Sequence, residues 1–480
     1  MFKKIKEFFR VLGELKYIIP LLKYKFPDPD DNESLAHSFE KTVEEFGNNN
    51  FIFFEDESWS YSETNKAANS LANKLVEDGV THSDRVVLFM ENRPDFIISI
   101  LALNKIGAIG VLINTSLTGK PLIHCINSSD SKKCIVGAEL AASLEAVLDE
   151  INIKDKEDIY WVEDGDRFIC PEWALSLKPL LDDSKDENLA ITNMVTAKDT
   201  AFYIFTSGTT GVPKAALFPN SKIIAASINI SKGGYRINDS DCMYNCLPLY
   251  HSTGLMLGLC ACVQVGAATF IRRKFSASAF WKEAKQFNTT AFVYVGELCR
   301  YLSFQDPSEE EKDNPISSMV GNGLRPDLWD CFRNRFNVER IIEIYGASEG
   351  NALFMNLLNK DETIGMTNAR VALFEYDVAE DKLVKDTESK FIEVDEGQPG
   401  LLLVEIGPDA IYNGYTDKKA SEEKIISNVF EEGDRWFNTG DLVKTMDVGF
   451  SLGRAHYQFV DRVGDTFRWK SENVSTNEVA

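Results

Sequence analysis

The sequence has few of the residues that build metal centres or disulfide frameworks. Its 480 residues include nine cysteines, none in a Cys-x-x-Cys pair, and five histidines, no two of them at metal-ligand spacing. A zinc site or a set of disulfides is therefore disfavoured, and the cysteine usage favours a reducing compartment. The N-terminus also lacks the apolar segment and small-residue cleavage site of a secretory signal. We therefore expect a cytoplasmic protein.

Positive charge and long apolar runs are also scarce. The chain has 51 Lys and Arg against 74 Asp and Glu, a net charge of −23 and a pI of about 4.8. Because nucleic-acid binding needs clustered Lys and Arg, nucleic acid is not expected as a partner. The longest uncharged run is 242–271, and its apolar part, 254–270, contains Gln264 and three glycines. It is short for a bilayer span, so a buried helix and strand are expected there.

What is present indicates an ordinary globular protein with more than one domain. Hydrophobic residues make up 44% and charged residues 26%, and 480 residues exceed one compact core. Between residue 34 and about 360, β-rich apolar runs alternate with helix-like stretches, which predicts an α/β fold with mostly parallel sheets. From about 365 to 460, short strand-like runs with turn signals predict a β-rich subdomain. The clearest runs of the first kind are 85–89, 110–113, 201–205 and 291–295.

Residues 1–26 differ from the rest of the chain, with seven Lys or Arg against two Glu. Apolar residues recur there at helical spacing and predict a basic amphipathic helix, interrupted at Pro20 and ended by Pro27 and Pro29. Such a helix could lie on an anionic membrane surface or pack on its own domain, and the pattern serves both. The apolar positions are Phe2, Ile5, Phe9, Leu12, Leu15, Ile19 and Leu22.

The strongest segment is 203–214, which reads YIFTSGTTGVPK. An apolar run leads into four hydroxyl side chains and two glycines, which let the backbone approach a ligand closely. Hydroxyls and backbone N–H groups gathered in this way bind phosphate oxygens, and the lysine adds positive charge. The spacing is not that of the Walker loop, GxxxxGK[ST]. The predicted phosphate-binding residues are Thr206, Ser207, Gly208, Thr209, Thr210, Gly211 and Lys214.

This loop resembles the signature loop of the adenylate-forming superfamily, which includes acyl-CoA synthetases, peptide-synthetase adenylation domains and luciferases. Further motifs follow in that family's order, from about residue 34 to the end of the chain. The resemblance implies an α/β fold. Its large N-terminal adenylation domain, at 27–461, is expected to contain two doubly wound, mostly parallel sheets packed together. A small β-barrel-like subdomain is expected at about 365–460, and a hinge opening a C-terminal domain at 462–480.

Two motifs resemble the adenine side of the family's site. The segment 321–326, GNGLRP, resembles the turn that backs the adenine, which implies roles for Gly321, Asn322 and Gly323. The segment 344–350, IYGASEG, resembles the next motif. There Tyr345 is expected to stack on the adenine, as an aromatic face suits, and Gly346 to lie beside the nucleotide.

The same resemblance implies phosphate, metal and acyl contacts. Ser348, where the family usually has threonine, keeps the hydroxyl expected to bind the α-phosphate. Glu349 and Thr206 are expected to hold Mg²⁺, a hard cation that takes oxygen ligands. The segment 241–254 resembles the one that lines the acyl site, with His251 near the substrate carboxylate. The residues expected in the chemistry are therefore Lys214, Glu349 and His251.

Near the C-terminus, 436–442 resembles the ribose motif and 461–470 the hinge motif. Asp441 is expected to accept hydrogen bonds from the ribose hydroxyls, and Arg462 to contact ribose or phosphate. Three segments, 295–301, 321–326 and 464–476, resemble the fatty acid transport proteins, also called very-long-chain acyl-CoA synthetases. That family has glycine where this chain has Ser471, in a loop that turns toward CoA, so thiolation is the less secure step.

The resemblance implies an enzyme that uses ATP, Mg²⁺ and CoA to activate a long- or very-long-chain fatty acid, peripheral on the inner face of a membrane. The chain ends at Ala480, just past the hinge. A lid domain of roughly 100 residues, which carries the family's adenylation lysine, is expected to follow, so we expect a fragment. Three alternatives stay open: a ligase for another bulky or polar acid, a fatty-acid-binding or uptake protein with little turnover, and a purely structural scaffold.

Overall fold

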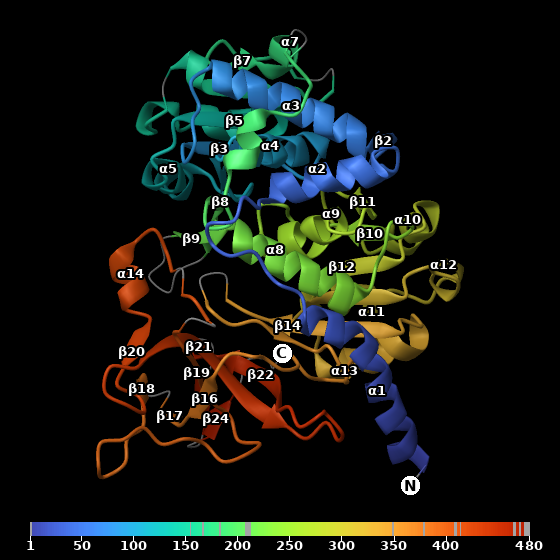
Figure 1. The fold of residues 1–480 in the computed structure, drawn as a ribbon, viewed down its shortest axis with the longest axis vertical. Coiled ribbons are helices and arrows are strands. Elements are labelled where there is room, and N and C mark those ends of the chain that lie inside the picture. The colour runs from blue at the N-terminus through green and yellow to red at the C-terminus, as the bar shows by residue number, and fades with distance from the viewer. Residues whose placement is uncertain are drawn as a thin grey trace.

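The structure, a computed structural model, describes residues 2–153, 155–165, 168–181, 184–206, 213–347, 350–377, 380–407, 410–412, 414–463, 467–469 and 472–474. Three main β-sheets organise these residues (Figure 1). Two are mostly parallel and lie one after the other along the long axis of the molecule, and the third is antiparallel and lies to one side of the second.

The first sheet has seven strands, and among its neighbouring pairs only β8 with β9 is antiparallel. Strands β3, β4 and β8 match the apolar runs predicted to be parallel strands to within one residue at each end. In sheet order the strands are β7 (Leu175–Ser176), β6 (Ile159–Val162), β5 (Lys133–Gly137), β3 (Arg85–Phe89), β4 (Ile109–Leu112), β8 (Thr200–Thr206) and β9 (Lys214–Pro219).

The second sheet has eight strands, parallel from β14 to β1, with an antiparallel strand at each edge. The predicted strand at 291–295 is β12. In sheet order the strands are β15 (Phe354–Met355), β14 (Arg340–Tyr345), β13 (Ser318–Asn322), β12 (Ala291–Val295), β10 (Cys242–Asn245), β11 (Ala268–Ile271), β1 (Asn50–Phe54) and β2 (Glu57–Ser60).

Helices cover both faces of these two sheets, because side chains alternate along each buried strand. Val86 and Leu88 of β3 face the core that the two sheets share, and Val87 and Phe89 face a core on the outer side. The shared core contains α2 (Leu35–Phe46), α3 (Tyr61–Glu77), α4 (Pro94–Lys105), α8 (Asn220–Ile228), η6 (Thr253–Cys260) and α9 (Ala261–Val263). The fold is the predicted doubly wound α/β arrangement with two sheets packed together.

The outer faces are covered by shorter helices. On the seven-stranded sheet these are α5 (Gly119–Ser128) and α6 (Ala141–Glu145), and on the eight-stranded sheet α10 (Phe280–Gln286), α11 (Gly296–Ser303), α13 (Pro326–Asp330) and η7 (Cys331–Arg335). The remaining short helices are η1 (Ala138–Leu140), η2 (Leu148–Glu150), η3 (Lys156–Asp158), α7 (Leu177–Leu181), η4 (Ala190–Met194), η5 (Asn229–Tyr235), α12 (Glu309–Lys312) and α14 (Lys418–Glu422).

The third sheet is antiparallel and five-stranded. Its longest strand, β21, pairs β20 along its first half and β22 along its second half. The strands are β16 (Val371–Phe374), β19 (Gly400–Glu405), β20 (Ile425–Ser427), β21 (Arg435–Met446) and β22 (His456–Arg462). Two small pairs accompany it, β17 (Tyr376–Asp377) with β18 (Lys382–Leu383), and β23 (Phe467–Trp469) with β24 (Glu472–Val474).

The uncharged run at 242–271 forms β10, η6, α9 and β11, and its apolar residues belong to the buried cores. The expectation of a buried helix and strand there is confirmed. Across the described part of the chain, none of the helices has both the length and the apolarity that crossing a bilayer requires.

Helix α1 (Phe2–Leu22) corrects the expected interruption at Pro20, because it continues through this proline to Leu22. Proline frees only the carbonyl four residues earlier, at the exposed Lys16, where water can satisfy it. Burial of Ile18 and Leu21 on either side of Pro20 holds the last turn against the domain.

Helix α1 packs against η5 and the end of α8, with its N-terminal end pointing away from the molecule (Figure 1). The packed face consists of Val11, Glu14, Ile18 and Leu21. Most of the predicted apolar stripe lies elsewhere on the helix, and Ile5, Phe9, Ile19 and Leu22 are exposed. The helix thus has two apolar faces, and the domain covers one of them.

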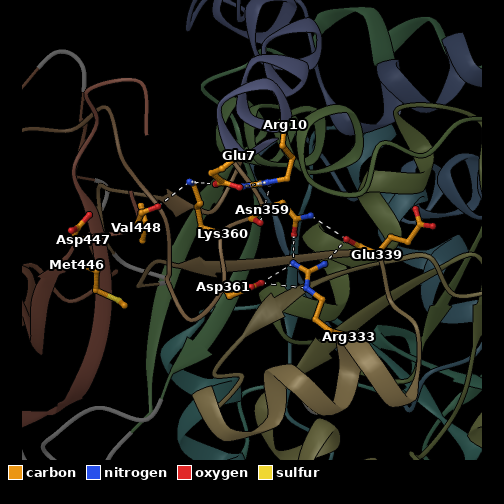
Figure 2. A pocket seen from close by; sticks show the side chains of 10 residues that line it. All are labelled: Glu7, Arg10, Arg333, Glu339, Asn359, Lys360, Asp361, Met446, Asp447 and Val448. Carbon is orange, nitrogen blue, oxygen red and sulfur yellow. Dashed lines mark hydrogen bonds and ion pairs between the residues drawn. The ribbon is translucent and has the colours of Figure 1, made fainter. Parts of the chain in front are cut away.

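Ion pairs join α1 to the domain at two places. Glu14 is buried and accepts hydrogen bonds from Arg236 and Arg340. Nearer the N-terminus, Figure 2 shows Glu7 between Arg10 and Lys360, beside a cavity of about 460 Å³ that reaches the β21–β22 hairpin. In that cavity each cation is held by a carboxylate, so the cluster acts as an anchor for α1. The third cation there is Arg333, paired with Asp361.

Candidate active site

The predicted phosphate loop lies between β8 and the edge strand β9 of the seven-stranded sheet. Antiparallel pairing places Thr206 opposite Lys214, so the two ends of the loop meet. The predicted residues inside the loop, Ser207, Gly208, Thr209, Thr210 and Gly211, lie outside the described residues.

Lys214 stands where the seven-stranded sheet meets the segment that precedes α14. Its Nζ lies 5.8 Å from the ring centroid of the buried Tyr415. The backbones also join there, through the bridge between Ala216 and Tyr415 and the 3.0 Å hydrogen bond from the Thr416 amide to the Ala215 carbonyl. The lysine is therefore held at a junction of two parts of the molecule.

The predicted adenine turn follows directly from β13 and needs its glycines. Gly323 has a φ of +80°, a conformation that side chains rarely adopt. A Cβ on Gly321 would lie 2.0 Å from the carbonyl oxygen of Tyr294, and a Cβ on Gly296 would lie 1.7 Å from that of Gly323. The turn therefore touches the start of α11 backbone to backbone. Asn322, the last residue of β13, is exposed.

Three predicted nucleotide-binding residues meet at the C-terminal end of β14. The Tyr345 hydroxyl donates to Oδ2 of Asp441 at 2.6 Å, and Nε of Arg462 donates to Oδ1 of the same carboxylate at 3.0 Å. Asp441 and Arg462 face each other across β21 and β22. Asp441 is 2% exposed, and burial together with this carboxylate raises the pKa of Tyr345 well above its usual value.

Each carboxylate oxygen has two lone pairs, so Asp441 can accept further hydrogen bonds beside the two that it receives. A neighbouring diol is a suitable donor. Gly346, which follows Tyr345, is exposed.

The predicted α-phosphate and metal ligands, Ser348 and Glu349, lie outside the described residues. Within the part of the chain that the structure describes, no group of three or more His, Cys, Asp and Glu side chains could hold a metal ion. Thr206, the other predicted Mg²⁺ ligand, is the last residue of β8, and its role as a ligand stays a prediction.

His251 follows β10 in a tight turn held by two buried asparagines. Asn92 donates to the carbonyl of Leu247 at 2.7 Å, and Asn245 donates to that of Gly254 at 2.9 Å. The His251 ring is open to solvent, yet the surrounding protein desolvates it and lowers its pKa below the usual 6.5. The ring is therefore neutral at physiological pH and can accept or donate a hydrogen bond.

The sequence reasoning missed Glu343, the carboxylate behind the predicted adenine turn. It is 3% exposed and accepts hydrogen bonds from the amides of Gly323 and Leu324 and from the Tyr294 hydroxyl. A signal was present, because this glutamate interrupts the apolar run of β14, RIIEIY. A charged residue in a buried strand is costly unless polar groups surround it.

Comparisons with known proteins agree with this arrangement. The family model described as AMP-binding enzyme matches residues 39–416. The chain is 38% identical over 451 residues to the medium/long-chain-fatty-acid–CoA ligase FadD6 of Mycobacterium tuberculosis, covering 94% of this chain and 72% of that protein. It is 38% identical over 440 residues to long-chain fatty acid transport protein 6 of Mus musculus, covering 90% of this chain and 69% of the relative.

Solved structures share the fold. The anthranilate CoA ligase AuaEII in complex with anthranoyl-AMP superposes with a TM-score of 0.76 at 18% identity, covering 96% of this chain and 82% of that one. The N-terminal domain of FACL13 from Mycobacterium tuberculosis, with a bound inhibitor, gives 0.70 at 20% identity, covering 90% and 100%. The chain spans 69–72% of the length of the two curated relatives named above.

Proposed function

The chain belongs to the AMP-binding enzyme family, and from this premise we propose that it is an AMP-forming ligase that activates a medium- to long-chain fatty acid. The observation that carries the proposal is the meeting of Tyr345, Asp441 and Arg462 at the end of β14, beside the turn at 321–323. An aromatic ring, a carboxylate with spare lone pairs and a cation together suit an adenine nucleoside with a charged 5′ group.

The proposed reaction has two steps. A carboxylate oxygen of the acid attacks the α-phosphorus of ATP, and the bond to the β-phosphate oxygen breaks, releasing pyrophosphate. The CoA thiolate, having given its proton to solvent, then attacks the acyl carbon, and AMP leaves. Neither step needs a protein nucleophile, so the protein mainly positions the reactants and offsets charge.

We assign the roles as follows. Asp441 accepts from the ribose hydroxyls, Tyr345 stacks on the adenine, and Arg462 contacts ribose or phosphate. The phosphates lie on the loop at 206–214, with Lys214 as the counter-charge. The remaining positions are Gly321, Asn322, Gly323 and Gly346 around the base, Ser348 at the α-phosphate, Thr206 and Glu349 on the Mg²⁺ of the substrate complex, and His251 near the acid.

The acid is proposed to have a long aliphatic chain, because relatives at 38% identity are named for medium- and long-chain fatty acids. Two competing functions remain for the experiment to separate. One is a ligase for another bulky or polar acid, and the other is a protein that holds acid and nucleotide without turnover.

The test is ATP–pyrophosphate exchange with Mg²⁺, with and without a C₁₆ acid. We expect exchange that depends on the acid, and its rate across acids of different chain length should peak at long aliphatic chains. Binding of ATP and acid with no acid-dependent exchange at any chain length, in a chain extended by the lid domain that the resemblance implies, would contradict the ligase and favour the holding protein. Asp441→Asn is the matched variant, and its KM for ATP should rise more than its KM for the acid.

We also propose that the uncovered face of α1 rests on an anionic membrane. Phe9 and Leu22 are each 65% exposed, and the ring centroid of Phe8 lies 4.9 Å from that of the exposed Phe450 in the β21–β22 hairpin, which widens the apolar surface. Four exposed lysines accompany it in a chain of net charge −23, namely Lys6, Lys16, Lys23 and Lys25. Apolar side chains flanked by lysines suit the interface of an acidic bilayer.

Co-sedimentation with vesicles containing phosphatidylserine tests this surface. We expect binding that weakens with salt and falls several-fold in the double variant Phe9→Ser and Leu22→Ser, whose ATP binding should be unchanged. Equal sedimentation of the variant, or binding that is the same to neutral vesicles in high salt, would contradict the assignment.

A further inference from the structure

Glu343 joins three segments of the eight-stranded sheet through one buried carboxylate. The Tyr294 hydroxyl donates to its Oε1 at 2.7 Å, and the Leu324 amide donates to the same oxygen at 2.8 Å. The Gly323 amide donates to Oε2 at 3.0 Å. Both oxygens are therefore engaged by the protein, and two of the three bonds hold the turn at 321–324.

The three segments are the ones that the proposed function uses. Tyr294 is the penultimate residue of β12 and lies two residues before α11 begins at Gly296. The turn carries Gly321, Asn322 and Gly323. Glu343 itself precedes Tyr345 by two residues on β14, so the two side chains leave the same face of the strand. One carboxylate thus sets the spacing between the turn, the helix α11 and the tyrosine.

The three donors match an ionised carboxylate. An ionised glutamate only accepts hydrogen bonds, whereas the protonated form presents an O–H that would face one of these N–H or O–H groups. The Tyr294 hydroxyl can reverse and accept from that O–H, but the two turn amides can only donate. Protonation therefore weakens their bonds, because hydrogen bonds to an ionised carboxylate are about twice as strong as neutral ones. At the turn, the weakened bonds are those of the Gly323 and Leu324 amides, which have no other acceptor among the described residues.

The surroundings of Glu343 make its protonation accessible near neutral pH. Its donors are all neutral, and burial raises the pKa of this carboxyl from 4.5 to about 7. The titratable groups next to it are Tyr294 and Cys299 of α11, and Tyr235 lies next to Tyr294. All three stay uncharged, because burial raises the pKa of each well above its ordinary value.

We propose that Glu343 is a positioning residue whose ionised carboxylate holds the turn at 321–324 in the shape that receives the adenine, so that its protonation weakens nucleoside binding. The proposal rests on the proposed function, because that function places the adenine on this turn. Glu343 acts through the turn and does not itself need to touch the nucleotide.

The experiment measures the affinity for adenosine from pH 5.5 to 8.5 by titration calorimetry. Adenosine is the probe because it carries no phosphate that titrates in this range. Wild-type affinity should fall as the pH drops below about 7. Glu343→Gln should bind about tenfold more weakly at pH 8, the loss expected for about one hydrogen bond, and its affinity should not vary with pH.

Two further variants separate positioning from general stability. Tyr294→Phe removes one donor from the carboxylate but leaves both turn amides, so the midpoint of the pH dependence should move to higher pH. Glu311→Gln changes another buried carboxylate, the one in α12 that pairs with Arg335. It should leave the pH profile of adenosine binding unchanged. Kinetically, Glu343→Gln should raise the KM for ATP more than it lowers kcat.

The outcomes distinguish this proposal from the one on which it rests. If the wild type binds neither adenosine nor ATP at any pH, the proposed function is wrong. If it binds adenosine with no pH dependence, or if a folded Glu343→Gln has the wild-type profile, only the role of Glu343 is overturned. Should Glu343→Gln fail to fold, the midpoint in Tyr294→Phe decides, and an unchanged midpoint counts against the proposal.

Discussion

Strand β14 buries two ionisable side chains, Arg340 and Glu343, in different surroundings. At its start, Arg340 shares the buried Glu14 with Arg236, so opposite charges face each other. Three residues further along the strand, Glu343 is held by a hydroxyl and two amides, all neutral. Four residues along one strand thus contain an ion cluster and an isolated carboxylate.

Burial disfavours the charged form of both side chains, but the consequences differ. It lowers the pKa of Arg340 to about 10, which leaves this arginine charged at physiological pH. It raises the pKa of Glu343 to about 7, where a small change in pH alters the charge. Arg340 therefore stays charged and anchors α1, whereas the charge of Glu343 depends on the pH.

The largest effect is expected from breaking the ion cluster. Glu14→Ala leaves Arg236 and Arg340 without their carboxylate, and removing one partner of a buried ion pair costs about 3–5 kcal/mol. Urea denaturation should show this loss in the free energy of unfolding. Lys6→Ala on the exposed side of the same helix is the control, and should change stability by less than about 0.5 kcal/mol. A loss below 1 kcal/mol in Glu14→Ala would mean that the cluster does not anchor α1.

The next effect is the pH dependence of stability that Glu343 causes. Between pH 4.5 and about 7, the unfolded chain has lost the Glu343 proton and the native chain still holds it. Stability from this group is therefore fully present below pH 4.5 and falls as the pH rises through that window, by about 3 kcal/mol in total. Glu343→Gln does not titrate, so the stability of the wild type relative to this variant should fall by that amount. Parallel pH profiles in urea would contradict the assignment.

Asp441 lies between the two cases, because it receives one bond from a cation and one from a hydroxyl. Tyr345→Phe removes the hydroxyl and should cost about 1 kcal/mol of stability while the ring remains. Tyr294→Phe, the same change beside Glu343, should cost at least as much at pH 8, because the other two donors to Glu343 are neutral amides. Thermal unfolding of both variants checks the order, and a larger loss in Tyr345→Phe would remove the contrast between the two carboxylates.

The smallest effect is expected on the uncovered face of α1. Leu22 is 65% exposed and its neighbour Leu21 is buried at 8%. Leu22→Ala should change the free energy of unfolding by less than about 0.5 kcal/mol, whereas Leu21→Ala should cost about 2 kcal/mol or more. Equal losses in urea denaturation would mean that both faces of the helix are covered in solution.

The sequence predicted what local pattern determines. Strands at 85–89 and 291–295 are buried on both faces, so they appear as unbroken apolar runs and could be recognised without a structure. The buried helix and strand at 254–270 followed from their length and glycine content. The family, and the doubly wound fold that it implies, followed from the order of short motifs such as the one at 206–214.

What depends on contacts between distant residues could not be predicted. The helical pattern of α1 was correct, but its packed face is set by Arg236, Arg340 and the surface around Leu358, far away in the chain. Pro20 was given too much weight, because packing of Ile18 and Leu21 outweighs one lost hydrogen bond. The roles of Ser207, Gly208, Thr209, Thr210, Gly211, Ser348 and Glu349 remain predictions.

The contact between Gly296 and Gly323 has a consequence for mutational scanning. Here the start of α11 and the turn at 321–324 meet through main-chain atoms, and a Cβ on Gly296 would lie 1.7 Å from the Gly323 carbonyl oxygen. An alanine scan measures what side chains contribute, and at this place there is none to remove. Alanine at position 296 adds the very atom that the contact excludes, whereas alanine at 323 is opposed by the positive φ of that residue. A library would report two intolerant positions and miss the link between them.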